Sequence, residues 1–201
     1  MALVRQHRGM KTILPLLSAL LALAAAPAAA EPASYVLDPQ HTFVQFEVLH
    51  FGTSTLRGRI GPVTGEVLLD RAAGRGEISL RIPVATVSTG LRIFDARLRE
   101  PDLLATEAYP EAYFVATRVR FEGERPVEVR GEFTFRGVGQ PLSLNTVRFA
   151  CRTETADGAP VEICGGDFEA ELLRSTFGAT FGLPFIGDRV QLRIQAEGRR
   201  R

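Results

Sequence analysis

The fold is decided by residues 190–196, which read Val190-Gln191-Leu192-Arg193-Ile194-Gln195-Ala196. Every even-numbered residue in this stretch is apolar and every odd-numbered one is polar. Successive side chains of a β-strand point to opposite faces, so this period of two is typical of a strand between water and an apolar interior. We expect the even-numbered side chains of this stretch to face inward.

The same alternation marks the segments around residues 44–48, 78–84 and 127–136. Further strands are predicted at about residues 55–70, 111–122, 140–155 and 159–174, many of them separated by the Gly and Pro clusters of turns. Most connections are too short for parallel crossovers, so the sequence predicts about eight antiparallel strands in an all-β barrel or strongly curved sheet. Its interior should be formed by Val44, Phe46, Val48, Ile78, Leu80, Ile82, Val84, Val129, Phe133, Phe135, Val190, Leu192 and Ile194.

Residues 91–108 break the alternation. Their apolar side chains recur every three to four positions, which predicts a short helical insertion of one or two helices. Pro101 should interrupt this segment, and Tyr109-Pro110 should end it.

Cys151 and Cys164 flank Asp157-Gly158, a strong signal for a two-residue hairpin turn. Pairing the strands about that turn places the cysteines directly opposite each other at a non-hydrogen-bonded pair, where side chains approach most closely. We therefore expect a cross-strand disulfide. The same register places Val147 opposite Phe168 as core residues, although a bulge at the intervening glycines would shift it.

Residues 1–30 have the parts of a cleavable export signal. Arg5, Arg8 and Lys11 precede an uncharged run at residues 12–23, and Ala28-Ala29-Ala30 is a small-residue cleavage site. The uncharged run is shorter than the roughly 20 residues of a spanning helix, so we expect no stable membrane insertion. Cleavage after about Ala30 would leave one domain, residues 31–201.

Cleavage would remove three of the 24 basic residues and none of the 23 acids, changing the formal charge from +1 to −2. The only lysine, Lys11, would leave as well. Nucleic acids and anionic membranes are bound by clustered cations, so we expect no nucleic-acid partner. The sequence leaves the oligomeric state open, including a homodimer.

No motif predicts catalysis or a metal site. His41 and His50 are nine residues apart, so on one unbroken strand they point to opposite faces and should not share a metal. No G-x-S-x-G nucleophile motif is present, and nearly all carboxylates fall on the solvent-facing phase of the strands. We expect no cofactor and no enzymatic activity. Paired carboxylates leave no sequence signature, so an enzyme remains the alternative.

Five blocks in order resemble the YceI-like family of polyisoprenoid-binding proteins. They span about Tyr35 to Glu197, and each block is weak alone. The blocks are Tyr35-Val36-Leu37-Asp38-Pro39-Gln40-His41-Thr42, Arg57-Gly58-Arg59-Ile60, Asp95-Ala96-Arg97-Leu98-Arg99 with Pro101-Asp102-Leu103-Leu104, Gly131-Glu132-Phe133-Thr134, and Arg174 with Phe177-Gly178 and Gly187-Asp188-Arg189-Val190. The chain departs from the family at Arg97, where a histidine is usual, and at Thr176, where an acid is usual.

The resemblance implies an eight-stranded antiparallel, lipocalin-like barrel in the periplasm, carrying or storing a long-chain amphiphilic lipid. A polyisoprenoid, or an isoprenoid quinone or its precursor, would then lie against the interior side chains named above. Polar groups near the mouth would be His41, Asp95, Arg97 and Arg174. Two alternatives remain: a lipid-modifying enzyme using buried carboxylates, and an interaction module whose filled barrel leaves a cavity below about 300 Å³.

Overall fold

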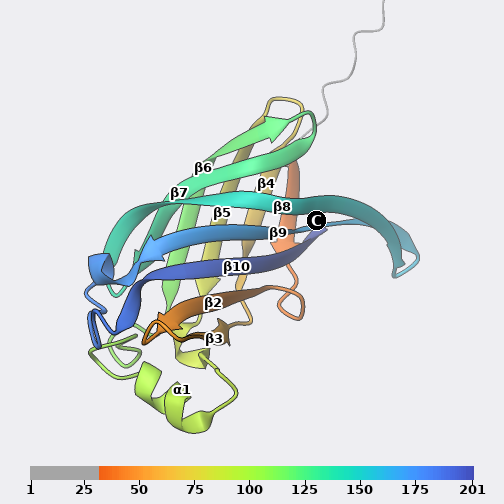
Figure 1. The fold of residues 1–201 in the computed structure, drawn as a ribbon. Coiled ribbons are helices and arrows are strands. Elements are labelled where there is room, and N and C mark those ends of the chain that lie inside the picture. The colour runs from red at the N-terminus through yellow and green to blue at the C-terminus, as the bar shows by residue number, and fades with distance from the viewer. Residues whose placement is uncertain (1–31) are drawn as a thin grey trace, which may run out of the picture.

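The computed structural model describes residues 32–201, which form ten strands, one α-helix and two 3₁₀ helices (Figure 1). The predicted export signal lies outside the described residues. Within residues 32–201, no helix has the length and apolar character needed to cross a bilayer. The elements are β1 (Ala33–Leu37), β2 (Phe43–His50), β3 (Ser54–Ile60), β4 (Thr64–Asp70), β5 (Arg75–Ile82), η1 (Val84–Thr86), α1 (Arg92–Leu98), β6 (Ala112–Glu122), β7 (Arg125–Phe135), β8 (Val138–Ala156), β9 (Ala159–Leu173), η2 (Arg174–Phe177) and β10 (Ile186–Arg200).

Eight strands close into an antiparallel barrel, which confirms the predicted fold class. Strands β1, β4, β5, β6, β7, β8, β9 and β10 are neighbours in that order, and β10 returns to β1, where Tyr35 lies opposite Arg200. Strand β2 pairs with the earlier part of β10, where Val44 lies opposite Ile194, and β3 pairs with β2. Strands β1 and β2 therefore lie on the same side of β10, with β2 beside its first part and β1 beside its last part.

The single strand predicted at residues 55–70 is wrong, because this segment forms two strands. Strand β3 pairs with β2, whereas β4 pairs with β1 and β5. Between them, Pro62 has no N–H to give to a strand ladder, and the N–H of Val63 donates to the carbonyl oxygen of Thr42 at 2.9 Å. Beside β3 the wall continues through Arg59 and Ser88, whose two backbone hydrogen bonds measure 2.8 and 2.9 Å.

The helical insertion is one helix, α1, followed by turns through residues 99–109. The buried carboxylate of Asp95 accepts hydrogen bonds from the N–H and hydroxyl of Thr89 at 2.6 and 2.8 Å, which holds the start of the helix against the preceding loop. Figure 1 shows α1 at the end of the barrel that also carries the β2–β3 turn and the β9–β10 connection. The β4–β5 and β6–β7 turns lie at the opposite end.

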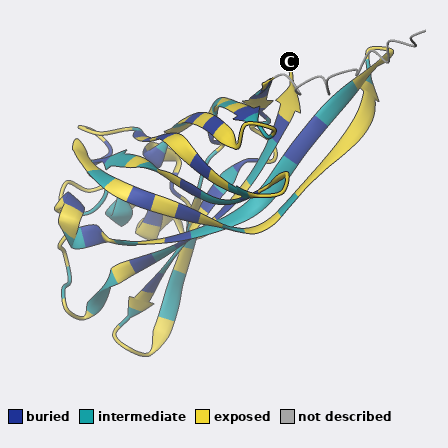
Figure 2. Cartoon of the chain, turned by 90° about the horizontal axis from the view of Figure 1, so that it is seen from above, coloured by how far each residue is buried: buried dark blue, intermediate teal, exposed yellow. Residues whose placement is uncertain are grey.

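Burial alternates along the strands as the sequence predicts (Figure 2). On β10, Val190, Leu192 and Ile194 are buried, whereas Arg193 is exposed. Most inward side chains of the other barrel strands join them in one apolar core, and Ala33, Tyr35, Leu69 and Cys164 form a second, smaller buried cluster. The alternation of buried and exposed residues follows from the two-residue period of a strand, because each strand of a closed barrel presents one face to the interior.

A disulfide joins Cys151 on β8 to Cys164 on β9, with the two Cα atoms 4.0 Å apart. The cysteines lie directly opposite each other, as the register about Asp157-Gly158 predicts. The expected partner of Phe168 is wrong: Thr146 lies opposite it, and Val147 is 55% exposed. The cause is a shift in the β8–β9 pairing register between Thr146 and Arg148. Val147 has no partner there and forms a bulge, farther from the turn than the pairs made by Gly165 and Gly166.

Candidate functional site

The barrel encloses an apolar cavity with a volume of about 350 Å³. This volume falls within the range of about 300–1,000 Å³ typical of ligand pockets. It is above the roughly 300 Å³ below which the barrel would count as filled. Eleven of the thirteen predicted interior residues line it. They are Val44, Phe46, Val48, Leu80, Ile82, Val84, Phe133, Phe135, Val190, Leu192 and Ile194.

Ile78 and Val129, the other two predicted lining residues, are buried in the apolar core but do not line the cavity. Each lies on a strand that lines the cavity farther along, at Leu80 on β5 and Phe133 on β7. Ile78 and Val129 lie nearer the β4–β5 and β6–β7 turns, where side chains fill the barrel. The cavity therefore occupies the α1 end, and the other end is solid core.

Sequence reasoning missed many of the lining side chains. Those on strands follow the same alternation, which was readable at Ala112 and Phe114 on β6 and at Leu142 and Leu144 on β8. Those of residues 91–108 had the helical period of that insertion, which did not show that they would face the barrel, and those of the other connections had no periodic signal. The additional residues are Thr42, His50, Leu56, Ile60, Val63, Phe94, Leu98, Leu103, Leu104, Ala112, Phe114, Leu142, Leu144, Leu172, Ala179, Phe181, Ile186 and Ala196.

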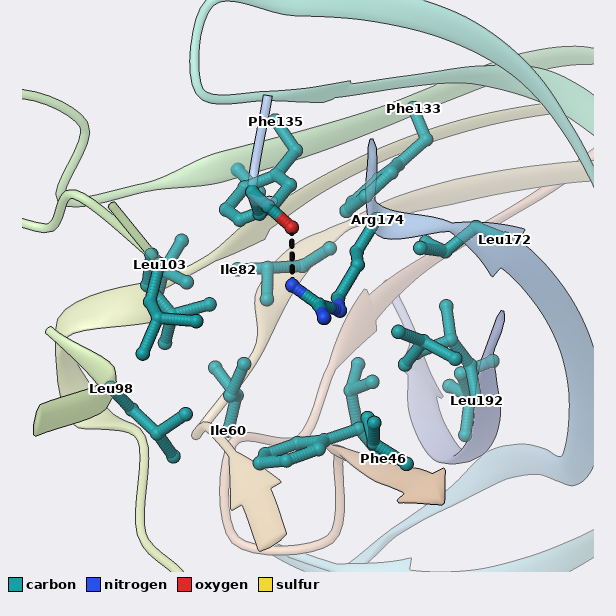
Figure 3. Close-up of a pocket in the computed structure, with 18 of the residues that line it drawn as sticks. Phe46, Ile60, Ile82, Leu98, Leu103, Phe133, Phe135, Leu172, Arg174 and Leu192 are labelled. Carbon is teal, nitrogen blue, oxygen red and sulfur yellow. Dashed lines mark hydrogen bonds between the residues drawn. The ribbon is translucent and has the colours of Figure 1, made fainter. Parts of the chain in front are cut away.

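The segment that includes α1 forms one side of the mouth. In the close-up of Figure 3, Leu98 and Leu103 point into the cavity across from Leu172 and Leu192. Phe94 lines the cavity while 45% exposed, and Phe181 does so from the β9–β10 connection at 43%. These two partly exposed rings place the opening between α1 and that connection.

Arg174 is the buried charged residue of the lining. Its Nε donates to the carbonyl of Gly187 at 2.8 Å, Nη1 to that of Ala179 at 2.5 Å, and Nη2 to that of Ile186 at 2.8 Å. Figure 3 shows the side chain reaching toward the cavity. Burial lowers the pKa of Arg174 below its usual value, and the charge of Asp188 partly offsets this. Its hydrogen bonds tie the β9–β10 connection to the barrel wall.

Arg97 lines the outer part of the cavity. Two hydrogen bonds of 2.6 and 2.7 Å join its guanidinium to the carboxylate of Asp102, and they lower the pKa of Asp102. The guanidinium carbon also lies 4.0 Å from the centroid of the Phe181 ring. This cation–π contact links α1 to the β9–β10 connection across the mouth.

His41 lies away from the cavity lining, in contrast to its predicted position near the mouth, whereas Asp95 lies on α1 beside the mouth without lining the cavity. His41 precedes β2, at the opposite end of that strand from His50, and its Nδ1 lies 2.9 Å from the carboxylate of Asp38. That hydrogen bond raises the pKa of His41 and lowers the pKa of Asp38. The carboxylate of Asp95 accepts the hydrogen bonds from Thr89 that hold the loop before α1, and these bonds lower the pKa of Asp95.

His50 lines the cavity at the far end of β2 from His41. An extended strand rises about 3.3 Å per residue, so nine residues hold the two rings far beyond the reach of one metal ion. Among the described residues, the one group with metal-ligating spacing is Cys151, Glu162 and Cys164, whose two sulfurs form the disulfide. No aspartate or glutamate is among the described residues that line the cavity.

Comparison with known sequences gives a family match over most of the chain. A family profile described as YceI-like domain matches residues 35–198. A UPF0312 protein of Photorhabdus laumondii is 37% identical over 138 residues, covering 67% of this chain and 70% of the relative. A UPF0312 protein of Pseudomonas savastanoi is 34% identical over 115 residues, covering 56% of this chain and 60% of that relative. These matches span 60 to 70% of the relatives' own length.

Solved structures share the barrel at low sequence identity. BcnA of Burkholderia cenocepacia superposes with a TM-score of 0.63 at 18% identity, covering 80% of this chain and 98% of BcnA. A polyisoprenoid binding domain from Saccharophagus degradans, implicated in plant cell wall breakdown, superposes with a TM-score of 0.60 at 16% identity, covering 83% of this chain and 98% of that domain. These structures show the shared fold, and with the profile match over residues 35–198 we conclude that the chain belongs to the YceI-like family.

Proposed function

We propose that the protein is a periplasmic carrier or store that holds one long-chain amphiphilic lipid inside its barrel. The observation that carries this proposal is the cavity of about 350 Å³, whose lining is apolar except for a few groups such as Arg97 and Arg174. Both guanidinium groups are already hydrogen-bonded within the protein. The space therefore suits a hydrocarbon chain, with the polar head of the lipid at the mouth.

The energetics of binding follow from burial. Each CH₂ group transferred from water to an apolar site contributes about 0.8 kcal/mol, so a long chain can bind without charged partners. A polyisoprenoid, or an isoprenoid quinone or its precursor, is the chain class we propose. The solved polyisoprenoid binding domain with the same fold supports that choice.

The proposed location rests on two features. Residues 1–30 have the pattern of an export signal, and the disulfide between Cys151 and Cys164 is typical of oxidising compartments. N-terminal sequencing of the exported protein should begin at Glu31. Recovery of an intact Met1 in a membrane fraction would contradict export with cleavage.

Two rival functions are less well supported. A lipid-modifying enzyme with buried carboxylates would have to draw them from outside the described cavity lining, which holds none. A filled-barrel interaction module does not account for the cavity volume. We therefore propose a binding protein.

The test is lipid binding by delipidated protein comprising residues 31–201. Geranylgeraniol should displace a fluorescent polyene fatty acid from the native protein. Ile194→Asp should abolish binding of both the fluorescent fatty acid and geranylgeraniol, because an unpaired carboxylate in an apolar cavity costs several kcal/mol or is forced to protonate. Phe46→Ala should weaken binding while the circular dichroism spectrum stays that of the native fold.

The matched control is Arg193→Gln, one residue before Ile194 and on the outer face of β10. Arg193 forms ion pairs with Glu47 and Glu169 there, so glutamine is a milder change than an acid would be. This variant should bind geranylgeraniol like the native protein. The carrier proposal fails if inward and outward substitutions act alike, or if the native protein binds no isoprenoid or fatty chain. If the proposal holds, mass spectrometry of lipid extracted from freshly exported protein would identify the natural ligand.

A further inference from the structure

Exposed aromatic side chains gather at one end of the molecule. The chain has thirteen phenylalanines, all within the described residues, and four of them are exposed. All four belong to the end of the barrel that carries α1, the β2–β3 turn and the β9–β10 connection (Figure 1). With two exposed aliphatic neighbours they form what we call the apolar rim: Phe51, Leu91, Ile93, Phe94, Phe181 and Phe185.

The stacked pair of the apolar rim joins the β2–β3 turn to the β9–β10 connection, and the contact of Arg97 with Phe181 joins that connection to α1. The rings of Phe51 and Phe185 are stacked with centroids 5.9 Å apart, and the N–H of Phe51 donates to the carbonyl of Phe185 at 2.7 Å. Phe94 and Phe181 belong both to the rim and to the cavity lining. The exposed apolar surface is therefore continuous with the interior of the cavity.

This exposure is not the ordinary scatter of apolar groups on a protein surface. Phe51, Phe185 and Ile93 are 58%, 65% and 72% exposed, and they lie on the turns and the helix at the α1 end of the barrel. By contrast, Val115 on β6 and Val147 on β8 are exposed on strands and lie outside this end of the barrel. Clustered exposed apolar groups mark a surface that another apolar body covers.

We propose that the apolar rim inserts into the surface of a lipid bilayer, so that a lipid passes between membrane and cavity without crossing water. This inference rests on the proposed function, because the lipid is what requires a membrane contact at the mouth. Continuity of the rim with the cavity favours a bilayer over a protein partner, since a bilayer supplies both a covering for the rim and the chain that enters. The driving force is apolar burial, as for interfacial segments rich in Phe and Leu.

The proposal does not require anionic lipid. The domain of residues 31–201 has a net charge of −2 and no lysine, so electrostatic attraction to acidic headgroups is weak. Binding to phosphatidylcholine vesicles should therefore occur and should persist at high salt. Loss of binding as salt rises would show an electrostatic contact and overturn insertion of the rim.

The test compares co-sedimentation of two double variants with phosphatidylcholine vesicles. Phe51→Ser with Phe185→Ser removes the stacked pair of the rim, and the vesicle partition coefficient should fall at least about tenfold, because burying one Phe is worth about that factor. Val115→Ser with Val147→Ser removes exposed apolar groups from strands outside the rim and should leave the coefficient unchanged. Equal loss in the two double variants would overturn the proposal.

Two further measurements separate this inference from the proposed function. Equilibrium binding of geranylgeraniol without vesicles should be unchanged in the rim variant, because Phe51 and Phe185 do not line the cavity. Its transfer from vesicles to protein should slow in step with the loss of vesicle binding. If the native protein binds geranylgeraniol but does not sediment with vesicles, the rim inference fails alone. If it sediments but binds no chain, the proposed function fails.

A second copy of the chain is the competing occupant of the rim. Light scattering of the native protein and of the Phe51→Ser, Phe185→Ser variant decides this point. We expect the same mass for both. A native dimer that the rim substitutions convert to a monomer, with no binding to vesicles, would assign the rim to an interface between copies.

Discussion

The ring of Phe46 lies directly against Gly58, its cross-strand partner on β3. A Cβ atom at residue 58 would lie 2.4 Å from Cζ of Phe46, closer than two carbon atoms can approach. Glycine at this position therefore leaves the space that the ring occupies along the cavity wall. The shape of the cavity depends on a residue that supplies no side chain to it.

Gly58→Ala should consequently weaken lipid binding without removing any lining side chain. The added methyl group overpacks the wall, which lowers folding stability by about 1–3 kcal/mol. It also displaces the Phe46 ring into space that the chain would fill, so the affinity for geranylgeraniol should fall by about 1.4 kcal/mol, or tenfold. In a Phe46→Ala background the clash with the ring is absent, and Gly58→Ala should then change affinity by much less. A double-mutant cycle in fluorescence displacement measures this coupling. Additive effects would show that the Phe46–Gly58 contact does not shape the cavity.

Arg174 should matter for the stability of the mouth. Arg174→Lys removes the planar set of donors that reaches Ala179, Ile186 and Gly187, and leaves buried carbonyl groups without partners. The free energy of unfolding should fall by about 2 kcal/mol in urea denaturation. Arg189→Lys, on the exposed side of β10, should change it by less than about 0.5 kcal/mol. Similar losses in both variants would argue against a special role for the Arg174 hydrogen bonds.

The disulfide should stabilise the β8–β9 hairpin. Cys151 and Cys164 are 13 residues apart, and the chain-entropy model gives about 3 kcal/mol for a loop of this size. Urea denaturation with and without reductant should show that loss in the native protein. The Cys151→Ser, Cys164→Ser variant should start at the lower stability and should not respond to reductant. Two titratable thiols in the unreduced protein would contradict the cross-link.

The pair of Asp38 and His41 predicts a pH dependence whose sign follows from the two shifts. The raised pKa of His41 means that its contribution to stability is complete below about pH 6.5 and is lost as pH rises through the folded-state value. The lowered pKa of Asp38 means that its contribution is present above about pH 3.8 and is lost as pH falls through the folded-state value. The pair therefore stabilises the protein most at mildly acidic pH.

NMR titration of the imidazole protons checks this directly. The pKa of His41 should lie above 6.5 in the native protein and return toward 6.5 in Asp38→Asn, because the main cause of the shift is the hydrogen bond to Asp38. An unchanged titration of His41 in Asp38→Asn would contradict the assigned cause.

The alternating strands and the position of the disulfide could be predicted from the sequence because they depend on local patterns. Those patterns left a barrel or a strongly curved sheet, and the closed eight-stranded barrel was what the family resemblance implied. Period-two alternation places Leu192 and Ile194 inward whatever the neighbouring strands are. The turn signal at Asp157-Gly158 fixes the cysteine register over the few residue pairs between them. Farther from the turn the prediction failed at Val147, because a bulge adds one residue without leaving a pattern in the sequence.

Tertiary structure alone decided where the barrel is hollow and how its mouth is built. Ile78 and Leu80 share one inward phase on β5, yet only Leu80 lines the cavity, because filling depends on the side chains that arrive from other strands. The mouth joins Phe51 to Phe185, which are far apart in the chain and carry no periodic signal. Alternation specifies which face of a strand is buried, whereas the depth of a cavity and the makeup of its rim arise from contacts between distant segments.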